Sequence, residues 1–236
     1  MKRVLVTRPQ PGATKTSERL LSQGFLPLVL PLTKIVPLPA KKPNGKFDAV
    51  AVTSANSLRQ APDTMLQSLL GLPCFVVGEA TAAVARARGF ETVTTGDGDG
   101  TSLAQIVVEE LCTGARILYL TGRVRAPDFE LALRKSGIHF RTMKSYDTVL
   151  VSYTTDFLVN FFSKGRIDCC LLYSRWGAEE FMRLSSQVDI AHHFDNTSVF
   201  CLSARVAAGL AGRDRSLIHV AGRPEEDALL ELLQGQ

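Results

Sequence analysis

An internal repeat constrains the fold of this chain more than any other feature. Residues 45–54 match residues 165–174, and each segment passes from Gly and a basic residue through an apolar run to a serine, Ser54 or Ser174. Residues 75–78 match 200–203, and residues 3–6 match 116–119. The repeated unit is a buried strand that stops at Ser, Thr or Gly and turns directly into a helix. Such turns place backbone N–H groups at one edge of a sheet, where anions bind.

Short apolar runs alternate with helical patterns along the whole chain. We predict strands near residues 3–7, 25–30, 48–53, 74–78, 91–95, 116–120, 138–142, 168–173, 198–202 and 216–220. We predict helices near residues 11–23, 55–70, 79–88, 101–112, 127–136, 155–163, 177–185, 204–211 and 225–234. This rhythm is typical of a doubly wound parallel α/β sheet.

Two stretches break the rhythm and leave the domain organisation open. Residues 33–43 carry three prolines, and residues 145–153 form an extended β-branched run, so both are interpreted as connections. A chain of 236 residues suits two domains. A tandem arrangement would divide it into residues 1–112 and 113–236. Alternatively, the first strand–helix–strand unit packs with the last three units.

The composition favours an ordinary globular protein. Hydrophobic residues make up 45% and charged residues 21% of the chain. No apolar run approaches the roughly 20 residues that cross a bilayer, and the N-terminal run is too short for a signal peptide. The net charge of +4 comes without a Lys/Arg block, which argues against nucleic acid but suits a cleft for a small polyanion.

Cysteine, histidine and glycine patterns predict no metal, nucleotide or thiol site. The five cysteines lack C-x-x-C spacing, and four of them fall in predicted buried strands, where we expect a structural role. Residues 96–100 resemble a calcium loop, but Val108 stands where the closing glutamate would be. The chain has neither a P-loop lysine motif nor a complete G-x-G-x-x-G motif.

Five short motifs in order carry a family resemblance over essentially the full chain. They are residues 6–9 (VTRP), 52–56 (VTSAN), 77–82 (VGEATA), 119–123 (YLTGR) and 146–148 (YDT). Together they resemble the uroporphyrinogen-III synthase family. The resemblance implies a cofactor-free cytoplasmic enzyme, which we expect to be monomeric, with two flavodoxin-like α/β lobes and a cleft between them. It also implies that residues 1–33 join 153–236, that 41–144 form the second lobe, and that 34–40 and 145–152 make a two-stranded crossover.

The substrate implied by the resemblance is hydroxymethylbilane, a linear tetrapyrrole polycarboxylate, and no membrane or nucleic acid partner is expected. Candidate carboxylate-binding residues lie at the strand exits: Thr7, Arg8, Thr53, Ser54, Gly78, Glu79, Ala80, Thr81, Gly122, Arg123, Ser174, Arg175, Gly177, Ser203, Ala204 and Arg205. Ser and Thr at these positions also suit simple helix capping. One helix terminus contributes about 0.3 to 1 kcal/mol to an anion, so many turns must act together.

Tyr146 is the catalytic candidate that the resemblance marks. Its phenol can donate a hydrogen bond to the departing hydroxyl group. The implied reaction is loss of water from hydroxymethylbilane and ring closure with inversion of the last pyrrole, which gives uroporphyrinogen III in heme biosynthesis. Such a dehydrating cyclase is a lyase. The alternative is a two-lobed module that binds a small anion without catalysis.

Overall fold

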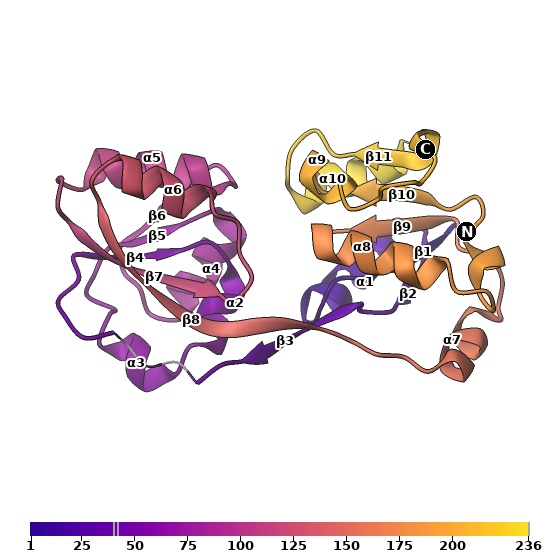
Figure 1. Ribbon diagram of the computed structural model, residues 1–236, viewed down its shortest axis with the longest axis horizontal. Coiled ribbons are helices and arrows are strands. Elements are labelled where there is room, and N and C mark those ends of the chain that lie inside the picture. Colours follow the sequence, from indigo (N-terminus) through magenta and orange to yellow (C-terminus); the bar gives the residue numbers. More distant parts are fainter. Residues whose placement is uncertain (40, 42, 236) are drawn as a thin grey trace. The chain divides into compact units, whose positions relative to one another are not determined.

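The computed structural model describes residues 1–39, 41 and 43–235 and divides into two compact units (Figure 1). Unit 1 comprises Met1–Lys34 and Val149–Gln236, and unit 2 comprises Ile35–Thr148. Residues 40 and 42, expected in the first linker and the second lobe, and residue 236, expected to end the first lobe, lie outside the described residues.

Unit 1 alternates strands with helices. Its elements are β1 (Arg3–Val6), α1 (Gly12–Ser22), β2 (Leu26–Val29), α7 (Thr155–Phe162), β9 (Cys169–Leu172), α8 (Arg175–Ser185), η1 (Ala191–His193), β10 (Ser198–Cys201), α9 (Ala204–Ala207), η2 (Arg215–Leu217), β11 (Ile218–Val220) and α10 (Glu226–Gln234). The strands pair in parallel in the order β11-β10-β9-β1-β2. Segments from both ends of the chain therefore share one sheet.

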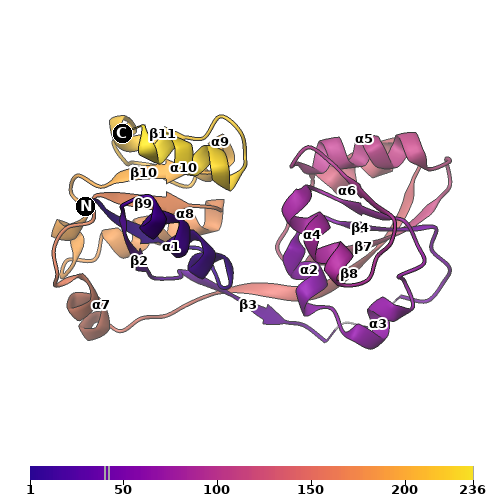
Figure 2. The same cartoon turned by 180° about the vertical axis from the view of Figure 1, so that it is seen from behind.

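Helices cover both faces of the unit 1 sheet. Alternate residues of a strand point to opposite faces, so a strand buried on both sides is apolar throughout. Leu5 and Cys170 pack with residues of α7, α8 and α9, whereas Val4 and Leu171 pack with residues of α1 and α10. Figure 1 shows α8 in front of the sheet, and Figure 2, from behind, shows α1 and α10 in front.

Unit 2 repeats this plan. Its elements are β3 (Thr33–Pro37), β4 (Ala49–Val52), α2 (Ala55–Gln60), α3 (Asp63–Gln67), β5 (Cys74–Val76), α4 (Glu79–Ala87), β6 (Val93–Thr95), α5 (Gly100–Glu110), β7 (Arg116–Gly122), α6 (Asp128–Lys135) and β8 (His139–Leu150). The sheet order is β3-β8-β7-β4-β5-β6, and the pairs from β8 to β6 are parallel. Val50 packs with α2, α3 and α4, whereas Ala51 packs with α5 and α6. The predicted doubly wound α/β class is confirmed.

The two irregular stretches of the sequence pair with each other. The Leu38 N–H donates to the Ser145 carbonyl at 2.9 Å, and the Val151 N–H donates to the Leu32 carbonyl at 3.0 Å. Chain position rises along one strand as it falls along the other, so β3 and β8 are antiparallel. The strand predicted at 138–142 thus continues to Leu150.

A single helix over residues 55–70 is a wrong prediction. Helix α2 ends at Gln60 and α3 begins at Asp63. Between them Ala61 is extended, with ψ of 135°, because the ring of Pro62 disfavours helical geometry in the preceding residue. Gly24, Gly89 and Gly137 follow the ends of α1, α4 and α6 and have positive φ angles, which glycine adopts readily at helix ends.

Membrane-spanning helices are absent from the described residues, since none of their helices is long and apolar enough.

Candidate functional site

Near the middle of each sheet, two neighbouring strands send their helices to opposite faces. In unit 1 this point lies between β1 and β9, because α1 and α8 cover different faces. In unit 2 it lies between β4 and β7, because α2 and α6 do the same. In open α/β sheets, ligands bind outside the carboxyl ends of the strands at such switch points. The candidate site residues follow these carboxyl ends.

At the switch point of unit 2, the hydroxyl groups of Thr53 and Tyr119 lie 2.8 Å apart. Tyr119 is buried in β7, and its ring contacts Phe129 edge-on at 4.9 Å between centroids. Because Tyr119 is fixed by this packing, its hydroxyl orients Thr53. Ser54 occupies the N-cap of α2 and accepts from the Asn56 N–H at 3.3 Å, so its predicted capping geometry is present.

Tyr146 lies directly over the end of β7. A Cβ atom added to Gly122 would lie 2.6 Å from Cζ and 2.9 Å from the hydroxyl oxygen of Tyr146. Only a glycine leaves room for the ring. Burial raises the pKa of Tyr146 above its ordinary value, although a hydrogen bond with Ser54 partly offsets this effect. The phenol therefore remains protonated at neutral pH and able to donate.

Arg123 is held beside Tyr146 by two contacts. Its N–H donates to the Tyr146 carbonyl at 2.9 Å, and its guanidinium pairs with the Asp147 carboxylate at 2.7 Å. Asp147 is nearly buried while the Arg123 side chain is 58% exposed. This arrangement leaves part of the cationic group open to solvent at the strand exit.

The turn from β5 into α4 contains four candidates, Gly78 to Thr81. Gly78 is the N-cap residue, and Thr81 is buried, whereas Glu79 and Ala80 face outward. The Glu79 carboxylate pairs with Arg86 at 2.7 Å. The Glu79 carboxylate would repel an anion that approaches this helix end. Only the backbone N–H groups of the turn therefore suit an anion.

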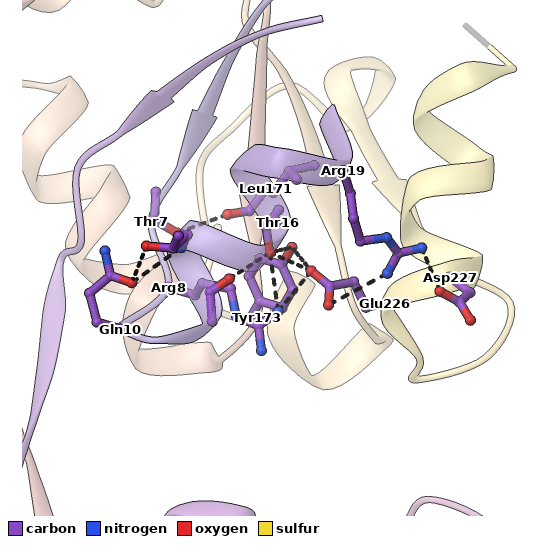
Figure 3. A network of polar contacts seen from close by, with 11 residues as sticks. Thr7, Arg8, Gln10, Thr16, Arg19, Leu171, Tyr173, Glu226 and Asp227 are labelled. Atoms are coloured by element: carbon purple, nitrogen blue, oxygen red, sulfur yellow. Dashed lines mark hydrogen bonds and ion pairs between the residues drawn. The ribbon is translucent and has the colours of Figure 1, made fainter. Parts of the chain in front are cut away.

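At the switch point of unit 1, Arg8 belongs to a polar network (Figure 3). Its guanidinium lies 2.8 Å from the Glu226 carboxylate and 4.2 Å from the centroid of the Tyr173 ring. Glu226 also accepts from the hydroxyl groups of Thr16 and Tyr173. Burial, followed by the charge of Glu226, raises the pKa of Tyr173 well above its ordinary value. Arg8 therefore already holds a carboxylate.

The Thr7 hydroxyl is committed to the sheet. It donates to the Leu171 carbonyl at 2.8 Å and is buried (Figure 3). Since β1 and β9 meet at the switch point, this bond joins the two strands there. The Thr7 carbonyl also accepts from the Leu32 N–H at 2.9 Å, so neither of these two oxygens is free for a ligand.

The exits of β9 and β10 differ in their capping. The Ser174 hydroxyl accepts from the Gly177 N–H at 3.0 Å, and Arg175 pairs with Glu179 at 2.9 Å. Ser203 occupies the N-cap position of α9 without a side-chain capping bond in the described structure, and Ala204 and Arg205 follow it exposed. The Ser203 hydroxyl is therefore better placed than that of Ser174 to serve a ligand.

Three residues of these sites are not among the predicted site residues, although Tyr119 and Asp147 lie within the motifs YLTGR and YDT. Tyr119 lies inside an apolar strand, Asp147 follows Tyr146, and Glu226 lies 218 residues from its partner Arg8. Their roles depend on which strands and helices become neighbours.

The predicted burial of the four strand cysteines is confirmed. Cys74, Cys169, Cys170 and Cys201 are buried, and burial raises the pKa of each thiol, to about 12 for Cys74 and Cys201. Protonated thiols are poor nucleophiles and metal ligands. No cluster of potential metal ligands occurs among the residues that the structure describes.

These features define the class: a protein of two doubly wound α/β units with small polar turns at the carboxyl ends of its strands. A family model described as uroporphyrinogen-III synthase HemD matches residues 14–231. The chain belongs to the uroporphyrinogen-III synthase family.

Individual relatives agree with this assignment. Uroporphyrinogen-III synthase of Saccharomyces cerevisiae is 33% identical over 89 residues, which cover 34% of this chain and 32% of the yeast protein. The match thus spans about a third of that relative. The crystal structure of the Helicobacter pylori uroporphyrinogen-III synthetase has a TM-score of 0.69 at 18% identity and covers 100% of this chain and 99% of its own. A mutant Thermus thermophilus uroporphyrinogen III synthase has a TM-score of 0.56 at 16% identity, with coverage of 100% and 97%. These two structures share the fold.

Proposed function

We propose that this protein is a lyase that cyclises hydroxymethylbilane, with loss of water and inversion of the last pyrrole ring, to uroporphyrinogen III in heme biosynthesis. The observation that carries the proposal is the family model, which matches residues 14–231. The structure contributes strand-exit turns that suit carboxylates, and the proposed substrate is a polycarboxylate.

Substrate binding is proposed to be spread over these turns. The backbone N–H groups at Ser54, Gly78, Ser174 and Ser203 face the carboxyl edges of their sheets, and Arg123 adds a half-exposed cation. A charge-assisted hydrogen bond contributes about 1.5 to 3 kcal/mol, so a few such contacts reach the roughly 8 kcal/mol of micromolar binding.

Tyr146 is proposed to donate to the hydroxyl group that leaves as water. Its raised pKa keeps the proton on the phenol, and its contact with Gly122 fixes the ring. A weakly acidic phenol stabilises the departing oxygen by hydrogen bonding. The hydroxyl group leaves with the pyrrole N–H proton as water, which gives an electrophilic azafulvene. The substituted carbon of the last pyrrole then attacks this azafulvene, and the spiro intermediate fragments and closes with that ring inverted.

We also propose that the enzyme works as a cytoplasmic monomer without a cofactor. This part rests on the family resemblance, and size-exclusion chromatography coupled to light scattering tests the monomer.

Incubation with hydroxymethylbilane tests the activity. Bilane left unprocessed closes in solution without inversion, to the symmetrical isomer, so the enzyme is expected to give the inverted isomer instead. Chromatography separates the two products. Formation of only the symmetrical isomer, with the bilane bound, would favour a binding module over a synthase.

A further inference from the structure

The amino ends of the strands carry a second set of residues, at the edge opposite the candidate site. In unit 2, the Asp48 carboxylate accepts from the Arg116 N–H at 2.8 Å, and the Asp48 N–H donates to the Arg116 carbonyl at 2.8 Å. In unit 1, Asp168 and Arg3 make the equivalent pair of bonds at 2.7 and 3.1 Å. The repeat thus builds the same aspartate–arginine backbone clamp in both units.

A pocket lies beside the clamp of unit 2. We call it the amino-edge pocket. It is lined by Asn44, Gly45, Lys46, Phe47, Arg116, Ile117, His139, Phe140 and Arg141. Its volume of about 320 Å³ is within the range for small-molecule sites, about 300 to 1,000 Å³.

The charged lining of the amino-edge pocket is basic. Lys46, Arg116 and Arg141 are exposed, and none has a carboxylate partner among the described residues, while His139 adds a fourth basic group. The carboxylate of Asp48 is already bonded to the Arg116 N–H. Phe47 and Phe140 supply the apolar walls, and the Arg134 guanidinium lies 5.3 Å from the centroid of the Phe140 ring.

Unit 1 shows that the fold does not require this basic lining. The pocket at the corresponding edge of unit 1 is bordered by Leu26, Pro27, Leu28 and Phe161, with Arg3 and Lys164. There the Arg3 guanidinium lies close to the backbone at Gly165, because a Cβ added to Gly165 would lie 2.8 Å from the Nη1 atom of Arg3. The same frame therefore accommodates a more apolar edge with two cations in unit 1, and an edge with three cations and a histidine in unit 2.

We propose that the amino-edge pocket of unit 2 binds a small multivalent anion, with carboxylate or phosphate groups, at a site separate from the strand exits. Cations focused in a concave site raise the local concentration of anions. Arg116 and Arg141 can each grip a carboxylate or phosphate group in a bidentate manner. The two phenylalanines provide apolar contact for the body of the ligand.

Titrating the full chain with citrate or with pyrophosphate at low salt tests the site. We expect either anion to shift the amide resonances of Gly45, Phe47, His139 and Phe140. Stronger binding of citrate would identify a polycarboxylate ligand, and stronger binding of pyrophosphate a phosphorylated one. Absence of shifts at these residues with both anions overturns the proposal.

A pair of matched double variants gives a second test. Lys46→Gln with Arg141→Gln is expected to weaken anion binding about tenfold or more, equal to about 1.4 kcal/mol. The control, Lys15→Gln with Arg166→Gln, removes the same charge from exposed positions of unit 1, and Arg166 is the repeat counterpart of Lys46. Equal weakening in both double variants would mean that the net charge alone attracts the anion, which contradicts a site.

Discussion

At the scale of single residues, Tyr146 and Gly122 form a tightly constrained contact of the candidate site. The tyrosine ring covers the only space where a Cβ on residue 122 could go. Tyr146 carries the proposed proton donor, and Gly122 determines where that donor lies. Each can be tested separately.

Tyr146→Phe removes the hydroxyl group and keeps the ring. The fold is expected to survive, and the rate of uroporphyrinogen III formation is expected to fall by about 100-fold or more, as for other positioned proton donors. Chromatography should show mostly the symmetrical isomer. An unchanged rate would remove Tyr146 from the chemistry.

Gly122→Ala keeps the hydroxyl group but displaces it. The new Cβ would lie 2.6 Å from Cζ of Tyr146, so the ring must shift, and the rate is expected to fall about tenfold or more. Gly71→Ala is the control, because a Cβ there meets no atom within 4 Å. Equal rates in both variants would contradict a positioning role for Gly122.

Cys74 makes the stability of the protein depend on pH. Burial raises the pKa of its thiol from 9.0 to about 12. Between these values the unfolded chain releases the proton and the folded chain keeps it, so the free energy of unfolding decreases as pH rises above 9, by up to about 1.4 kcal/mol per pH unit. Urea unfolding of Cys74→Ala between pH 8 and 10.5 should show a shallower decrease. Cys112→Ala, whose thiol is exposed, should retain the wild-type slope, and identical slopes in all three proteins would refute the argument.

At the scale of helices and strands, the strand exits serve both capping and proposed binding. Ser174 caps α8 with a side-chain hydrogen bond, whereas Ser203 stands at the start of α9 without one in the described structure. Each serine follows a strand and precedes a helix. Substituting them one at a time therefore tests helix capping and ligand binding separately.

Ser174→Ala is expected to reduce the free energy of unfolding by about 1 kcal/mol through loss of the cap. Ser203→Ala should reduce it by much less and yet weaken substrate binding by about 1 kcal/mol, the contribution of one neutral hydrogen bond. Urea unfolding and KM measurements check both values. A larger loss of stability from Ser203→Ala than from Ser174→Ala would reverse this assignment.

At the scale of the whole molecule, the chain divides into two units that differ in how they are connected. Unit 2 is a continuous stretch with both faces of its sheet covered, whereas unit 1 needs both ends of the chain. We propose that the two units are independently folding lobes, as the family resemblance implies.

Residues 35–148, expressed alone, are therefore expected to fold cooperatively, with the m-value of a small compact domain. Residues 1–112 are the control, because that fragment lacks β7 and β8 of unit 2 and β9 to β11 of unit 1. A folded 1–112 fragment together with an unfolded 35–148 fragment would support the tandem arrangement instead.

The sequence by itself determined the local elements. Apolar runs ending at Thr7, Thr53, Ser174 and Ser203 predicted strands that lead into helices, and the structure has a strand at each. These predictions succeed because the burial of a strand and the capping of the helix that follows it depend on residues that are close together in the sequence. Periodicity alone predicted one helix over residues 55–70. The ring of Pro62 interrupts that helix, so the structure has two shorter helices, α2 and α3.

Only the tertiary structure decided which elements became neighbours. Parallel strands with similar apolar patterns are interchangeable as partners, so the strand patterns left open whether β1 would pair with β9 or with strands of the first half, and only the family resemblance favoured β9. The Arg8–Glu226 pair follows from that choice. The Tyr119–Thr53 contact and the fit of Tyr146 on Gly122 follow from the order β8-β7-β4 in unit 2. Side-chain contacts across the sheet depend on strand order and register, and strand order is set by how the whole chain covers its apolar surfaces.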